Sequence, residues 1–109
     1  MAIDIEKLAK DMFNAAFLVL KARAPKIKVI AQGEFKKIAQ TLLTIEAELA
    51  AGQITREEAT LLVEMQKSAT RSVLLMSEGM SLIVAEQAIN SALDVARAAV
   101  NTATGVKVL

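Results

Sequence analysis

Apolar residues recur along this chain at spacings of three and four residues, which is the period of an α-helix. Near the amino terminus Ile5, Leu8 and Met12 share one sector, while Lys7 and Lys10 lie opposite. Strict alternation of apolar and polar residues, which is typical of β-strands, is not found. We therefore expect an all-α protein of one domain, residues 1–109. The predicted helices cover residues 3–23, 26–51 and 55–104.

Two local signals separate the predicted helices. Pro25 disfavours helical geometry in the residue before it, so the first helix should end there. The stretch LAAGQITREEA contains Gly52, which suits a left-handed helix cap, and Thr55 with Glu58, which form a capping box. Ile54 precedes the cap and suits a hydrophobic staple. This turn predicts that the second and third helices lie side by side and antiparallel.

The third predicted helix contains no proline, but its pattern changes at Gly79. On a straight helix, the polar sectors before and after Gly79 lie about 110° apart, more than a regular heptad drift produces. We therefore expect an antiparallel hairpin or bundle of three helices with a long third helix kinked near Gly79. A complete break there would give a four-helix bundle instead. On its first part the apolar side contains Leu62, Met65, Ala69, Val73 and Met76.

Methionines gather in the same region. Met65, Met76 and Met80 lie on or near one side of the third helix. Because methionine is flexible and fills irregular gaps, we expect them to fill the core. A methionine-lined groove that binds helices of other proteins is the alternative interpretation.

A stripe of small residues follows the last predicted helix. Small side chains allow helix axes to approach to the close end of the 8–10 Å range. The stripe and its apolar flanks are too wide for one neighbour, so two neighbouring helices are expected. They belong either to the same chain or to a second copy, and we favour a homodimer or larger homo-oligomer. The predicted self-association residues are Ser77, Ser81, Ala85, Ala88, Ala92, Ala96, Ala99 and Ala103.

Composition argues against most catalytic chemistry. The chain has no Cys and no His, which excludes Ser-His-Asp and Cys-His mechanisms and the usual ligands of zinc, haem and iron–sulfur clusters. Its four glycines are scattered and form no phosphate-binding loop. Hydrophobic residues make up 54% of the chain but aromatic residues only 3%. We therefore expect no catalytic residues, no metal site, no cofactor and no enzymatic activity.

Charge is distributed unevenly along the chain. Residues 1–37 contain eight basic and four acidic residues, whereas residues 38–64 contain one basic and five acidic residues. A basic cluster could bind an anionic ligand, or it could be a solvated face, and the acidic region could receive the basic cluster of another copy. The lack of stacking aromatic residues makes nucleic acid an unfavoured partner. The predicted cluster contains Lys21, Arg23, Lys26, Lys28, Lys36 and Lys37.

Neither an export signal nor a membrane span is expected. Acidic residues precede the first apolar run, and the apolar segment 81–103 contains Glu86, Asp94 and Arg97, which oppose insertion into a bilayer. We predict a cytoplasmic, non-catalytic structural or protein-interaction module that self-associates through helix packing of bundle or coiled-coil type. A membrane-surface or membrane-perturbing helical protein is the alternative. A nucleic-acid accessory protein using segment 21–37 is a further alternative.

Overall fold

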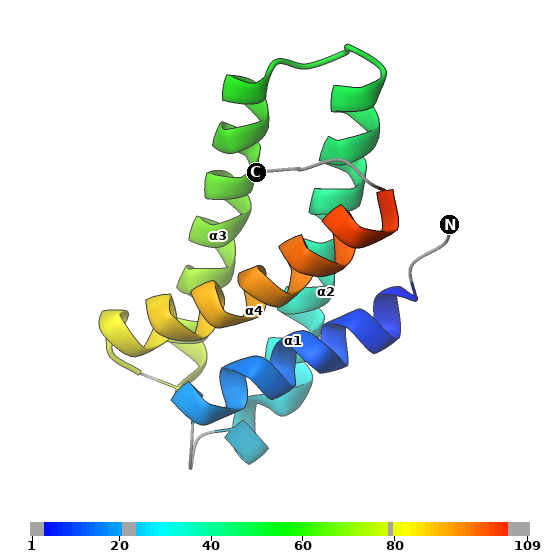
Figure 1. Ribbon diagram of the computed structural model, residues 1–109. Coiled ribbons are helices and arrows are strands. Elements are labelled where there is room, and N and C mark those ends of the chain that lie inside the picture. The colour runs from blue at the N-terminus through cyan, green and yellow to red at the C-terminus, as the bar shows by residue number, and fades with distance from the viewer. Residues whose placement is uncertain (1–3, 21–23, 79, 105–109) are drawn as a thin grey trace.

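The computed structural model describes residues 4–20, 24–78 and 80–104 (Figure 1). Within these ranges the chain forms four helices and no strand. They are α1 (Ile5–Leu20), α2 (Ala24–Ala50), α3 (Arg56–Glu78) and α4 (Leu82–Thr104). The all-α prediction is therefore confirmed.

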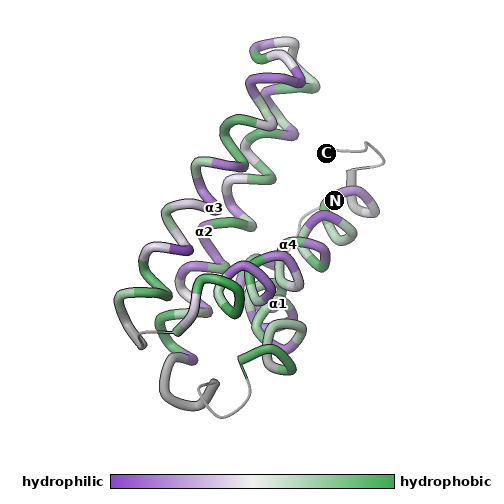
Figure 2. The backbone as a smooth tube through the Cα atoms, turned by 90° about the vertical axis from the view of Figure 1, so that its left-hand side faces the viewer, coloured by the Kyte–Doolittle hydropathy of each residue, from purple (hydrophilic) through white to green (hydrophobic). Residues whose placement is uncertain are grey.

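The helices pack as two crossed pairs. α2 and α3 run antiparallel, and α1 and α4 lie together across the lower part of this pair (Figure 1). α1 packs most extensively against α4 and also against α2. The turn between α2 and α3 projects away from α1 and α4, as the rotated view shows (Figure 2). The result is an elongated molecule of 42 × 25 × 16 Å.

The turn between α2 and α3 has the caps that its sequence predicts. Gly52 has a φ of 70°, in the left-handed region where glycine is favoured. Its N–H donates to the Leu49 carbonyl (3.1 Å), and the Gln53 N–H donates to the Glu48 carbonyl (2.9 Å), which is a Schellman motif. The capping box closes the other side of the turn. Thr55 Oγ1 accepts the Glu58 N–H at 3.1 Å, and Glu58 Oε1 accepts the Thr55 N–H at 2.9 Å.

The expected long helix 55–104 is divided into two helices, as in the alternative of a complete break near Gly79. α3 ends at Glu78 and α4 begins at Leu82, while Met80 and Ser81 between them are not helical. Ser81 caps α4, because its Oγ accepts the Val84 N–H at 3.2 Å. Gly79 itself lies outside the described residues. The change of polar sector therefore marks a full break, which lets α3 and α4 turn different faces toward the core.

The start of α2 also differs from the prediction. α2 begins at Ala24, so Pro25 lies in its first turn instead of before the helix. The first turn tolerates proline because its backbone N–H groups have no partner within the helix. Residues 21–23 lie outside the described residues, and α1 is described only to Leu20.

The core lies where α1 and α4 cross α2 and α3. It consists almost entirely of aliphatic side chains and Phe13 and Phe35, as expected from the composition. Thr70 on α3 is a fully buried polar residue, and its Oγ1 accepts a hydrogen bond from Gln66 Nε2 at 3.4 Å. Ion pairs join Lys36 to Glu6 and Arg71 to Glu86 between helices. The largest fully buried side chains are Phe35, Met12, Leu20, Ile38, Leu42, Ile45, Leu74, Ile89, Leu93 and Val100.

Candidate functional site

The small-residue stripe of α4 lies inside the single chain. Ala85, Ala88, Ala92 and Ala96 have no exposed surface, and Ala99 is half-buried against the core. Ser81 is exposed, and the side chains of Ser77 and Ala103 lie outside the described ones. α1, α2 and α3 supply the neighbours of α4. The close neighbours of the stripe thus belong to the same chain, and a second copy could reach its central alanines only if these helices separated.

Of the predicted basic cluster, the structure describes the side chains of Lys28, Lys36 and Lys37. Lys37 Nζ lies 2.9 Å from Glu34 Oε2, and Lys36 pairs with Glu6 of α1. Lys28 is exposed on the first turns of α2. The structure does not describe the side chains of the other three members, Lys21, Arg23 and Lys26. Sequence proximity grouped Lys36 and Lys37 with the others, but both already have a carboxylate partner in the chain.

The burial of α3 corrects the expectation for its apolar side. The buried residues of α3 are Ala59, Val63, Thr70 and Leu74, whose mean direction lies roughly a third of a turn from the predicted apolar side. Met80 is buried as expected, but Met65 and Met76 are 60% and 85% exposed, so the expectation that they fill the core is wrong. We call this exposed side the outer face of α3. It consists of Leu61, Leu62, Met65, Ala69, Val73 and Met76.

The outer face of α3 is apolar and uncharged along its length. Leu61, Met65, Ala69 and Met76 are exposed, and Leu62 and Val73 are half-buried. Between Leu61 and Met76 the remaining positions on this side, Ser68 and Ser72, are small and uncharged, and exposed Glu58 lies on the same side one turn before Leu61. An exposed apolar patch of this kind on a small protein indicates an interaction surface. The sequence carries this signal as the apolar side of residues 56–78, but periodicity alone does not show whether that side is buried.

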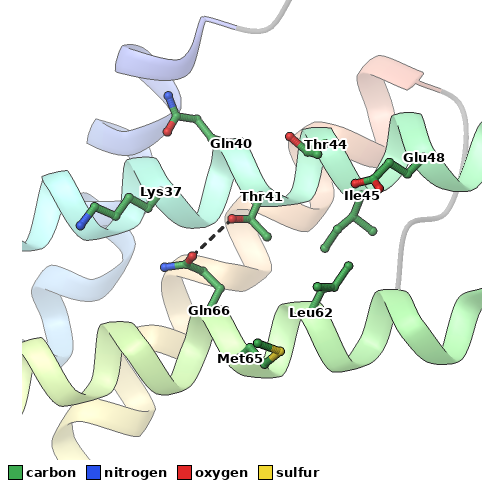
Figure 3. Close-up of a pocket in the computed structure, with 9 residues that line it drawn as sticks. All are labelled: Lys37, Gln40, Thr41, Thr44, Ile45, Glu48, Leu62, Met65 and Gln66. Atoms are coloured by element: carbon green, nitrogen blue, oxygen red, sulfur yellow. Dashed lines mark hydrogen bonds between the residues drawn. The ribbon is translucent and has the colours of Figure 1, made fainter. Parts of the chain in front are cut away.

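A groove runs beside the outer face, between α2 and α3. It has a volume of about 540 Å³. Its lining includes Ile45 from α2 and Leu62 and Met65 from α3, and Figure 3 shows Ile45 and Leu62 directed toward each other. Thr41 Oγ1 donates to Gln66 Oε1 at 3.4 Å across the groove (Figure 3). The groove therefore offers an apolar floor bordered by polar groups, with Lys37 and Glu48 of α2 as its charged members.

A second exposed apolar region lies where α1 ends, α2 begins and α4 begins. These helix ends gather in the lower part of the molecule (Figures 1 and 2). We call this region the apolar end, and Lys28 is exposed within it. Acidic residues are absent from the sequence between Asp11 and Glu34. The exposed apolar side chains of the apolar end are Leu18, Val29, Ile30, Leu82 and Ile83.

Among the described residues, no group of three or more carboxylates is placed to hold a metal ion. In the same ranges, no helix combines the length and the apolarity needed to cross a bilayer.

No known protein family matches this chain, and no curated protein or solved structure is significantly similar to it. Its function is therefore inferred from the surface that the fold leaves exposed.

Replacement of Ala92 by leucine tests the placement of the stripe. Because Ala92 is fully buried within one chain, Ala92→Leu should lower the free energy of unfolding by about 1–3 kcal/mol through overpacking. Ala98→Leu is the matched control, since Ala98 is exposed on the same helix. Urea unfolding of both variants measures the difference. Equal stability of Ala92→Leu and wild type would show that α4 does not pack in this way.

Proposed function

We propose that this chain is a non-catalytic interaction module that associates with a second copy of itself through the outer face of α3. The observation that carries this proposal is an uncharged apolar helix face left uncovered by the other helices. A helix of a monomeric globular protein normally turns its apolar stripe inward and its charged residues outward. α3 instead exposes Leu61, Met65 and Met76.

The energy available from this face suits a reversible association. Leu61, Met65 and Met76 are 61%, 60% and 85% exposed. Burying what remains exposed of each side chain contributes about 1–2 kcal/mol. Two copies of the face together offset the loss of translational and rotational freedom, which opposes every association. We therefore expect an oligomer that forms with rising protein concentration.

Substitution on the outer face should weaken self-association. Met65→Asp places a carboxylate in the contact and removes an apolar side chain, so the dissociation constant should rise at least tenfold. Light scattering over a dilution series measures the mass of wild type and variant. Thr60→Asp is the control. Thr60 is exposed on the opposite side of α3, and this substitution introduces the same charge as Met65→Asp.

Two results would contradict this function. A wild-type chain that is monomeric from micromolar to millimolar concentration would exclude self-association. Equal association of Met65→Asp and wild type would show that another surface carries it.

A membrane surface is the second candidate function, and the apolar end supports it. Exposed Leu18 and Val29 lie in a stretch of sequence that carries basic residues and no acid between Asp11 and Glu34, and exposed Ile83 adds an apolar side chain from the start of α4. Apolar side chains together with basic residues favour binding to anionic lipid. This function uses a surface separate from the outer face of α3.

Vesicle binding tests the second candidate. The chain should sediment with vesicles that contain an anionic lipid and not with neutral vesicles, because both the apolar and the basic residues contribute. Ile83→Asp should reduce the bound fraction severalfold, whereas Asn90→Asp, on the exposed polar side of the same helix, should not. Equal binding to anionic and neutral vesicles, or none to either, would count against this function.

A further inference from the structure

The outer face of α3 is arranged almost symmetrically about Ala69. Leu62 and Met76 lie seven residues before and after Ala69, and Met65 and Val73 lie four residues before and after it. Large apolar side chains thus flank a small central residue on both sides. Such an arrangement is self-complementary when a second copy of the helix is turned end over end.

From this arrangement we propose that two copies pair through their α3 helices, antiparallel, about a two-fold axis at Ala69. The inference rests on the proposed function, since it names the surface that receives the outer face. In this pairing Leu62 lies opposite Met76 of the second copy and Met65 lies opposite Val73 of the second copy. Ala69 of one copy lies opposite Ala69 of the second copy, and because both side chains are small the two helix axes can approach closely. A two-fold contact closes on itself and yields a dimer.

Charge favours the antiparallel direction over the parallel one. The first turn of α3 contains Glu57 and Glu58, both exposed. A parallel pair would place these glutamates beside their copies, where like charges repel. An antiparallel pair separates them by most of the length of the helix and also aligns the helix dipoles favourably. The six residues of the outer face itself carry no charge that would oppose contact.

The groove between α2 and α3 gives the second copy a place to insert a side chain. Leu62 and Met65 form the α3 side of this groove, and Ile45 lies at its floor (Figure 3). Because Leu62 lies opposite Met76 of the second copy, the long thioether side chain of that methionine reaches the groove. Met76 is 85% exposed in the single chain, and the pairing gives it an apolar environment. The two-fold axis repeats this insertion at the other end of the contact.

Single cysteines test the axis directly, because the chain has none of its own. Ala69→Cys places two thiols at the axis, within the Cα separation of about 4.4–6.8 Å that a disulfide requires. Under mild oxidation, Ala69→Cys should form a covalent dimer at least tenfold faster than Thr60→Cys on the opposite side of α3. Ala69 is exposed, so the substitution leaves the core unchanged.

The direction of the helices is tested by a mixture of two variants. Met65→Cys and Val73→Cys should each crosslink slowly alone, and an equimolar mixture should crosslink at least fivefold faster. A parallel pair would instead crosslink rapidly with Met65→Cys alone. That result would overturn the antiparallel arrangement.

The outcomes separate failure of this inference from failure of the proposed function. A wild-type dimer by light scattering, together with slow crosslinking of Ala69→Cys, would overturn the axis while self-association stands. A monomer at all concentrations would overturn both. A monomer that binds anionic vesicles would transfer the function to the apolar end.

Discussion

The close contact between the small-residue side of α4 and its neighbours is the constraint on which the rest of this fold depends. Ala85, Ala88, Ala92 and Ala96 are fully buried, and α1 contributes Ala9 and Ala16 to the same core. Small side chains on both helices allow a close approach, and larger side chains beside them, such as Met12 and Leu93, are buried in the same core. In this core α1 and α4 pack more extensively against each other than against any other helix.

Because α1 and α4 pack mainly against each other, they cover only part of the surface of α3. α3 packs mainly against α2 and α4, and its buried side is a narrow row from Ala59 to Leu74. A chain of 109 residues does not have enough surface to cover every side of every helix. The outer face of α3 is the apolar surface left over. We infer that a second copy, and not the chain itself, supplies its partner.

Local signals in the sequence predicted the helical fold and the turn between α2 and α3, but they left the break between α3 and α4 open and placed the start of α2 after Pro25. The packing of α3 depends on distant residues. The turn around Gly52 and Thr55 was predictable because its hydrogen bonds join neighbouring residues. The apolar side of α1, including Leu8 and Met12, was also predicted and is buried. Periodicity identifies the apolar side of residues 56–78, but it shows which residues share a side and not which side meets α2 and α4. The expectation that Met65 and Met76 fill the core is wrong for this reason. The side of α3 that faces the core instead includes Thr70, a fully buried polar residue.

Methionine and alanine methyl groups provide the most direct test of this account, because they report each surface separately. In nuclear magnetic resonance spectra recorded over a dilution series, the methyl signals of Met65, Met76 and Ala69 should shift with protein concentration. The signals of Met12, Met80, Ala88 and Ala92, which are buried in the single chain, should stay constant. Concentration-dependent shifts of Ala88 and Ala92 with constant signals from Met65 and Met76 would contradict the account, since they would show that the small-residue stripe, and not the outer face of α3, meets a second copy.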